Sequence, residues 1–282
     1  MSLRMRDALM SGLPQLRHEP TARRIRAVLG GTTVVDSTAA VLVWEPRRIV
    51  PAYAVPLDDV RGTREPGGPA PDGLPGGVSV PDLSSRPVLD PSVPFLCHTA
   101  DGQMVDLAVD GTARPGAGFL LADPDLRGYV LLDFGAFDAW YEEDELNVAH
   151  PKDPFKRIDV LSGSRHVRVE RDGVLLAQST RPRILFETHL PPRYYLPRED
   201  VRVELRPSPT RTWCAYKGQA SYLSPVVGEE PVADLAWTYL EPRHDAEQVR
   251  GLVAFFDERL DVEVDGRPQE RPVTPWSARP AG

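Results

Sequence analysis

The stretch RHVRVERDGVLLAQSTRPRILFETHLPPRYYLPREDVR, residues 165–202, decides the fold of this chain. Its first third alternates apolar and polar residues around an Asp-Gly pair, the strongest short-range signal for a β-hairpin. RILFE at 183–187 and SYLSPVV at 221–227 are also rich in strand-forming residues. The sequence therefore predicts a mainly β domain in this region.

A second copy of the pattern begins at residue 23, with RRIRAVLGGTTVVDSTAAVLVWEPRRIVPAYAVPLDDVR over 23–61. The matches keep their order along the chain, which is the signature of an internal repeat. We interpret the chain as a tandem duplication of one β-rich unit. The paired positions are Gly31 with Gly173, Glu45 with Glu187, Tyr53 with Tyr194, Pro56 with Pro197, Cys97 with Cys214, and Phe119 with Trp237.

The repeat suggests the following domain organisation. Residues 1–22 form an N-terminal extension, 23–146 the first repeat, 147–164 a linker, 165–262 the second repeat and 263–282 a tail. A Gly- and Pro-rich insert, 62–91, is expected to be an exposed loop without regular structure.

Helical spacing of apolar residues occurs over 245–260, where Val249, Leu252, Val253 and Phe256 share one helical face. We therefore expect two tandem small β-rich domains, each closed by a short C-terminal helix.

Composition excludes several classes. A net charge of -8 over 282 residues argues against a general nucleic-acid binder. No apolar run reaches the about 20 residues that a membrane span needs, and the first twenty residues lack a secretory core, so we expect a cytoplasmic protein without a membrane partner. Two cysteines and six scattered histidines predict neither a disulfide framework nor a metal site. No cofactor motif is present, so no cofactor is expected.

The second repeat carries the motifs DGVLLAQS, LFE, YYLPREDV, TRTWCAYKGQASY, AWTYLEP and VRGLVAFF. With these motifs it resembles the bacterial family called domain of unknown function 427, which is also labelled a nucleotidyltransferase family. The chain looks like the tandem form found in actinobacteria. The resemblance implies a small Mss4-like or β-tent fold without zinc ligands. One departure is Ala215, where the family usually has proline.

The motif TRTWCAYKGQASY, 210–222, holds the candidate site. Cys214 and Lys217 lie three residues apart, and the chain has three lysines against thirty arginines. A cation stabilises a thiolate, and a lysine can also hold an anionic group. We expect a small-molecule site with Lys217 as the cation, and Cys214 and Lys217 as candidate catalytic residues. Its other ligand-binding residues would be Trp213, Tyr222, Trp237, Glu187 and Tyr194.

A structural interpretation competes at each position. A single cysteine in a β domain usually serves as a small buried apolar residue, and the tryptophans are as well suited to a core. Glu187 can form a structural ion pair with Arg183 or Arg193. In the first repeat Asp101 falls where Lys217 stands, and Asp106 where Tyr222 stands, so that copy looks degenerate and the site is expected in the second.

Three functions follow from these alternatives. The first is binding of a small anionic or nucleotide-like ligand in the second repeat. The second is a group-transfer enzyme of nucleotidyltransferase type that uses Cys214 or Lys217, with His189 or Glu187 brought close as the base. The third is a structural protein that self-associates through exposed edge strands.

Overall fold

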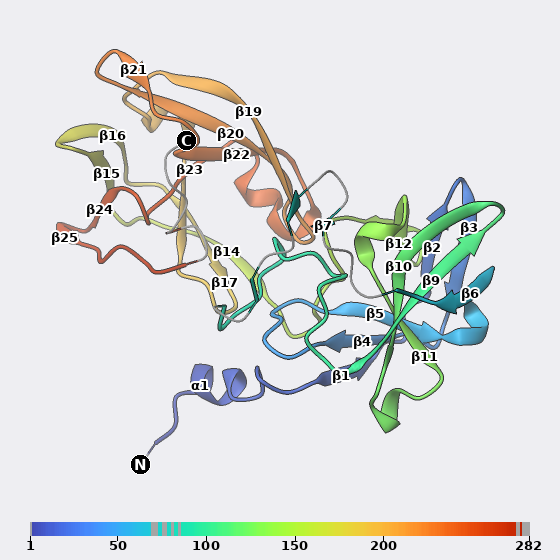
Figure 1. Ribbon diagram of the computed structural model, residues 1–282. Helices are drawn as coiled ribbons and strands as arrows, with labels where there is room; N and C mark the ends of the chain where they lie inside the picture. Colours follow the sequence, from blue (N-terminus) through green and yellow to red (C-terminus); the bar gives the residue numbers. More distant parts are fainter. Residues whose placement is uncertain are drawn as a thin grey trace. The chain divides into compact units, whose positions relative to one another are not determined.

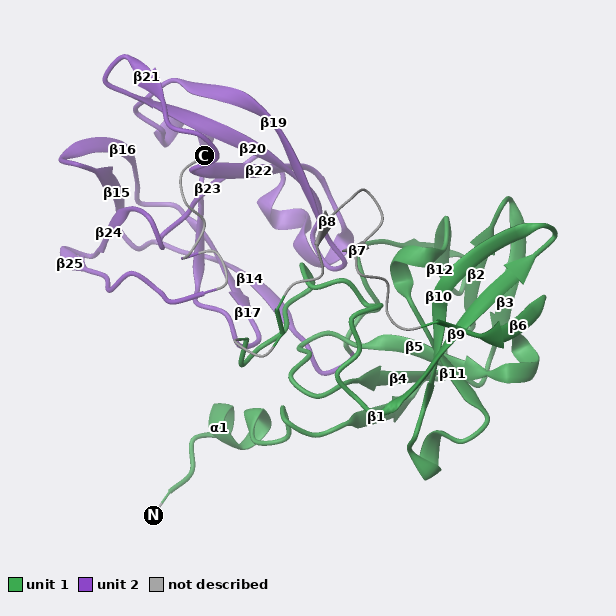
Figure 2. Ribbon diagram, viewed as in Figure 1, with its two compact units in different colours: residues 1–153 green, residues 154–282 purple. Residues whose placement is uncertain are grey.

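The computed structural model of the chain describes residues 2–68, 73–74, 78–79, 82–83, 86–274 and 277. The chain is mainly β and forms two compact units, residues 1–153 and 154–282 (Figures 1 and 2). No helix in the described ranges is long and apolar enough to cross a membrane.

The first unit contains a seven-stranded sheet, ordered β1-β4-β5-β11-β10-β9-β6, and a four-stranded sheet, ordered β13-β12-β2-β3. Its elements are α1 (Met5–Met10), β1 (Arg17–Pro20), β2 (Ile25–Leu29), β3 (Thr32–Ser37), β4 (Val41–Trp44), β5 (Ala52–Pro56), η1 (Leu57–Asp59), β6 (Thr63–Pro66), β7 (Gly73–Leu74), β8 (Val78–Ser79), β9 (Gly102–Val109), β10 (Thr112–Leu121), η2 (Pro124–Leu126), β11 (Tyr129–Leu132), η3 (Phe134–Ala136), β12 (Ala139–Glu142) and β13 (Glu145–Asn147).

The second unit contains a larger sheet, ordered β14-β17-β18-β23-β22-β20-β19 with β21 paired to β20, and a smaller sheet, ordered β16-β15-β24-β25. Its elements are β14 (Ile158–Ser162), β15 (Val167–Arg171), β16 (Val174–Ser179), β17 (Arg183–Glu187), β18 (Arg193–Leu196), η4 (Arg198–Asp200), β19 (Leu205–Cys214), β20 (Gly218–Val227), β21 (Glu230–Pro231), β22 (Ala236–Pro242), η5 (His244–Val249), β23 (Val253–Phe255), β24 (Asp261–Val264) and β25 (Arg267–Pro268).

Strand order and register agree between the units. Taken in chain order, the strands of both larger sheets follow the same path, and so do those of both smaller sheets. Phe119 pairs with Met104 and Leu131, and Trp237 pairs with Tyr222 and Ala254 in the same way. These ladders make Phe119 and Trp237 equivalent positions, and Met104 and Tyr222 likewise.

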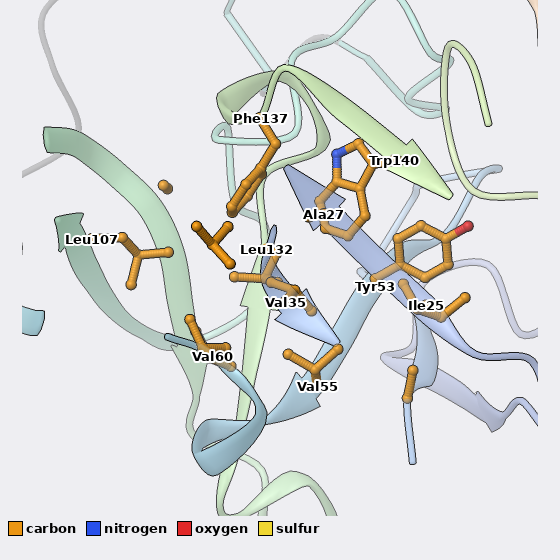
Figure 3. Close-up of a cluster of buried hydrophobic side chains, with 14 of the residues drawn as sticks. Ile25, Ala27, Val35, Tyr53, Val55, Val60, Leu107, Leu132, Phe137 and Trp140 are labelled. Atoms are coloured by element: carbon orange, nitrogen blue, oxygen red, sulfur yellow. The ribbon is translucent and has the colours of Figure 1, made fainter. Parts of the chain in front are cut away.

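Each larger sheet buries both of its faces. In the first unit one face packs on the smaller sheet, where Ile25, Trp140 and Tyr53 meet in one apolar core (Figure 3). The opposite face holds a second cluster that includes Phe95 and Phe119. The second unit has the same two-sided arrangement. Each larger sheet is therefore a central layer with an apolar core on both of its faces.

The predicted hairpin forms as β15 and β16, with Asp172 and Gly173 in the two-residue turn at φ 50° and 79°. Both angles lie in the left-handed region, which glycine adopts without steric cost. We expect Gly173→Ala to lower the free energy of unfolding by about 1 kcal/mol, because Cβ disfavours that conformation. Urea denaturation measures it. Gly135→Ala is the control, because Gly135 is outside the left-handed region; an equal loss in both variants would contradict the turn argument.

The predicted helix over 245–260 is wrong. The short 3-10 helix η5 ends at Val249, Gly251 follows at φ 70°, and β23 begins at Val253. β23 lies between β18 and β22 and is buried on both faces, so its apolar residues run without a gap. A strand that is buried on both faces lacks the apolar–polar alternation of a half-exposed strand. Its apolar residues, together with Val249, therefore matched the spacing of a helix. In the described part of the chain the one α-helix is α1, at the N-terminus.

The expected boundaries also differ from the structure in places. β1 of the extension joins the larger sheet of the first unit, and β14 of the linker joins that of the second. The insert 62–91 contains β6, which pairs with β9, and the buried Leu89. The parts of the expected loop at 69–72, 75–77, 80–81 and 84–85 lie outside the described residues, while 73–74 and 78–79 pair as β7 and β8.

Candidate functional site

A buried glutamate stands at the same ladder position in each unit. Glu45 directly follows β4 and Glu187 ends β17, and both are less than a tenth exposed. An isolated buried carboxylate is costly unless it is paired and hydrogen-bonded. The two units solve this problem with different partners for the carboxylate.

In the second unit Glu187 lies between two lysines. Lys217 donates a hydrogen bond to Oε2, and the Lys156 Nζ lies 2.9 Å from Oε1. Burial by itself would raise the pKa of Glu187, but the two ammonium groups lower it from 4.5 to about 2. Glu187 is therefore a carboxylate at any physiological pH.

Lys217 likewise keeps its charge in a mostly buried position. Its side chain is 12% exposed. Burial alone would lower the pKa of Lys217. The charges of Cys214 and Glu187 have the larger effect and raise this pKa well above 10.5. An amine that keeps its proton is a poor nucleophile, so this charge state suits an electrostatic role. It also means that the cation already has a counter-ion.

The expected aromatic walls do not surround a common space. Tyr222 and Trp237 are cross-strand partners in a core cluster, with the Trp237 and Phe256 ring centroids 4.5 Å apart. Tyr194 packs in the cluster on the opposite face of the sheet, and Trp213 is 55% exposed on β19. The structure thus brings Lys217 and Glu187 together and leaves Trp213 and Tyr194 apart from them.

Cys214 is half-buried at the end of β19, opposite Gly218 in the hairpin. Gly218 has a φ of 92°, so the turn that follows the cysteine depends on glycine. His189, which we considered as a base, lies in the turn just after β17 and itself has a positive φ of 68°.

In the first unit the partner of the glutamate is a histidine. The His98 Nδ1 lies 3.0 Å from Oε2 of Glu45, while the backbone N–H groups of Thr99 and Ala100 donate to Oε1 at 2.9 and 3.1 Å. Burial raises the pKa of Glu45, but the hydrogen bond and charge of His98, with the charge of Arg48, bring it below its usual value. Glu45 is therefore an ionised acceptor that orients the imidazole.

Arg48 holds the segment that precedes His98. It is 1% exposed and donates to the carbonyl oxygens of Val93, Pro94 and Cys97 at 3.0, 2.6 and 2.7 Å. Because these oxygens belong to consecutive turns of one loop, the buried guanidinium fixes the loop's path. The position of His98 is thus fixed by the buried Arg48, which holds the loop that precedes it.

The imidazole of His98 is buried and half-satisfied. Its side chain is 8% exposed and stacks on Phe119, with ring centroids 3.8 Å apart and an interplanar angle of 10°. The Nε2 atom is buried and has no hydrogen-bond partner among the residues that the structure describes. The imidazole is thus held by the carboxylate at one edge and by an aromatic ring on its face.

A cavity of about 360 Å³ adjoins this histidine. Its walls are mainly apolar, with two sulfur-containing side chains and the acidic Asp101. The lining residues are Leu83, Leu96, Cys97, His98, Ala100, Asp101, Gly102, Met104 and Phe119. Cys97 belongs to a small apolar cluster, and burial raises the pKa of its thiol, so this cysteine is a wall and not an activated nucleophile.

The size of three side chains explains why the space is open here. At positions where the first unit has Met104, Phe119 and Leu121, the ladders place Tyr222, Trp237 and Tyr239 in the second. The larger aromatic side chains are buried in the core of the second unit. The first unit, which has the smaller residues, therefore has room for a ligand at this place.

The expected site in the second unit stays a prediction, whereas the cavity that the structure describes lies in the first unit. Gly102 opposes Leu121 and Ala220 opposes Tyr239, so the match of Asp101 with Lys217 and of Asp106 with Tyr222 is wrong by two residues. His98 is the residue whose side chain meets the glutamate. The sequence signal that could have indicated this residue is a histidine directly after Cys97, in the unit that has no counterpart of Lys217.

Other groups missed from the sequence are Lys156 and Arg48. Lys156 lies in the expected linker and Arg48 in a run of two arginines after β4, and neither position has a pattern that marks burial. Among the described residues, no group of three His, Cys, Asp or Glu side chains is placed to hold a metal ion.

The model of the family described as "Domain of unknown function (DUF427)" matches residues 159–266. The match spans the second unit from β14 to β24, which supports the resemblance of that unit to the family. No curated protein matches the chain.

Proposed function

We propose that this protein, whose second unit matches a family without an assigned activity, binds a small molecule in the cavity of its first unit. The observation that carries the proposal is the cavity of about 360 Å³ with mainly apolar walls, one of which is the ring of His98, held in place by Glu45 and the stacked Phe119.

The cavity suits this role in size and lining. Its volume of about 360 Å³ lies within the usual range for small-molecule sites. Such sites combine mostly apolar walls with a few fixed polar groups, and here the fixed group is His98, held by Glu45 and Phe119. The glutamate is itself held by two backbone amides, so the histidine is preorganised.

We also propose that the two units are copies of one fold, of the Mss4-like or β-tent type. The identical strand order and the equivalent ladders of Phe119 and Trp237 support the duplication. In this view the second unit keeps the family motif and fills its interior with aromatic residues, while the first has opened the equivalent space.

Ligand binding by the second unit remains a prediction, as does group transfer by Cys214 or Lys217. Both would require an incoming group to compete with Glu187 for Lys217. Self-association through edge strands and a cytoplasmic location are likewise predictions. The first-unit cavity is favoured because the structure describes a space there, whereas in the second unit Lys217 is already paired with Glu187.

The methionine methyl groups provide a direct test. Met104 lines the cavity, whereas Met5 is 72% exposed on the N-terminal helix α1. In full-length protein with labelled methionine methyls, titration with phenol or toluene is expected to shift the Met104 resonance and leave Met5 unchanged.

The blocking variant is Ala100→Phe, because Ala100 lines the cavity and an added ring fills it. Ala113→Phe is the matched control, at an exposed position on β10 of the same unit. We expect the Met104 response to be lost in the first variant and kept in the second. No response in the wild type, or a response that survives Ala100→Phe, would show that the cavity is not a binding site.

A further inference from the structure

We propose that the first unit binds an extended peptide segment, which adds as a strand to the outer edge of β9 and places one apolar side chain in the cavity. This inference rests on the proposed function and adds the chemical class of the ligand. Binding of this kind takes its affinity from main-chain hydrogen bonds and its specificity from a pocket for a side chain. The second unit supports it, because a strand of its own chain covers the equivalent edge.

β6 and β19 are equivalent strands of different length. Each lies at one end of its larger sheet. In β6, Pro66 opposes Val105. In β19, Pro207 opposes Leu223, and the two pairs occupy the same ladder position. β19 continues past its proline as far as Cys214, whereas β6 ends at its proline. The outer strand is therefore complete in the second unit and short in the first.

The additional length of β19 covers a part of the neighbouring strand that is uncovered in the first unit. Thr212 of β19 opposes Ala220, which is 4% exposed. The equivalent of Ala220 is Gly102 of β9, which is exposed. Among the described residues, pairing on the β6 side of β9 ends with the 2.8 Å hydrogen bond from the Gly67 N–H to the Met104 carbonyl. A strand edge of this kind is a template for pairing with another segment.

The cavity lies where a side chain of the added strand would point. In the second unit, the Thr212 hydroxyl donates a hydrogen bond to the Tyr222 hydroxyl at 3.3 Å, so the two side chains share one face of the sheet. Met104 is the equivalent of Tyr222 and lines the cavity. A peptide residue opposite Gly102 therefore directs its side chain into the cavity. Its two neighbours point to the other face, because side chains alternate along a strand.

The lining of the cavity selects an apolar side chain. Most of the lining is apolar or contains sulfur, from Leu83, Leu96, Cys97, Met104 and Phe119. An apolar side chain that enters this space is removed from water, which is favourable. A carboxylate would lose its hydration close to Asp101, and the described lining residues include no lysine or arginine to pair with it. The expected partner is an extended segment with one leucine, methionine or phenylalanine between polar residues.

A peptide copied from β19 is the probe. It contains residues 210–214 with Thr212→Leu and Cys214→Ser, so that leucine stands at the position that enters the cavity. Titrated into full-length protein with labelled methionine methyls, it is expected to shift the Met104 resonance. The same peptide with Thr212→Asp should bind at least about tenfold more weakly, because it lacks the apolar side chain. Equal affinities would show that no side chain enters the cavity.

Two N-methylated forms of the leucine peptide test the strand pairing. One is methylated at the N–H of the leucine, and the other at the N–H groups of both neighbours. Alternate residues of an antiparallel strand exchange hydrogen bonds with the adjacent strand. One form should therefore lose binding while the other keeps it. Equal affinities of the two forms would show that the peptide does not pair with β9.

The titration with toluene keeps this inference separate from the proposed function. If toluene shifts the Met104 resonance and the leucine peptide does not, the cavity binds small molecules and the peptide inference is wrong. If neither shifts it, the proposed function fails as well. A Met104 shift that follows protein concentration alone would identify a second copy of the chain as the partner and overturn the peptide inference.

The variants of the small-molecule test also apply to the peptide. Ala100→Phe fills the cavity and should weaken the leucine peptide at least about tenfold, whereas Ala113→Phe should leave its affinity unchanged. Undiminished binding to Ala100→Phe would contradict the inference. Where that variant does not fold, the comparison of the peptides on the wild-type protein decides.

Discussion

Glu187→Gln is expected to destabilise the second unit by about 3–5 kcal/mol, because it leaves two buried ammonium groups without a counter-ion. Lys217 and Lys156 are 12% and 18% exposed, and both contact this one carboxylate. Urea denaturation followed by tryptophan fluorescence measures the loss, since Trp237 lies in the core next to the cluster. Glu199→Gln is the control, because Glu199 is 64% exposed in its pair with Arg181; such pairs contribute less than about 1 kcal/mol.

The pH dependence of stability gives a second measure of the same group. The pKa of Glu187 is lowered in the folded state from 4.5 to about 2. The unfolded chain therefore binds the proton more tightly, and stability falls as pH decreases from about 5 to about 2. The difference corresponds to about 3 kcal/mol. Glu187→Gln should remove this part of the acid sensitivity; an unchanged acid profile and a loss below about 1 kcal/mol would show that the cluster is not the stabilising element.

Asp257→Asn is expected to have the opposite effect and to stabilise the protein by about 2–4 kcal/mol at pH 8. Arg193 forms a two-point pair with Glu258, and its Nη1 lies 3.4 Å from Oδ2 of Asp257. One guanidinium thus serves two carboxylates. Burial and the neighbouring charge of Glu258 outweigh Arg193 and raise the pKa of Asp257 from 3.8 to about 7.

The direction of this pH effect on stability follows from which state binds the proton. Between about pH 4 and pH 7 the folded protein holds the proton on Asp257 and the unfolded chain does not, so stability decreases as pH rises through this range. Asparagine mimics the protonated acid, and the variant should lose this slope. Thermal unfolding from pH 5 to pH 8 measures it, with Asp261→Asn, 63% exposed, as the control. A loss of stability at pH 8 in Asp257→Asn would mean that the pairing of the ionised carboxylate with Arg193 outweighs the cost of its burial.

Much of the β architecture could be predicted from local pattern. The Asp-Gly pair at 172–173 and the alternation on either side of it led to a hairpin that the structure contains, and RILFE and SYLSPVV lie in β17 and β20. These signals are local, since turn conformation and alternation depend on residues close in the chain. β23 was missed for the converse reason: its strand state comes from burial between β18 and β22, which are distant in sequence.

The candidate site shows the same division. The sequence by itself pointed to Glu45 and Glu187 as equivalent acids and to Lys217 as an unusual cation, because residue type and order along the repeat carry that information. Only the tertiary structure revealed the cavity in the first unit. Cross-strand pairing places Met104 and Phe119 where the second unit has Tyr222 and Trp237. Whether a cavity remains depends on the summed volume of side chains from several strands, and no single segment of sequence contains that sum.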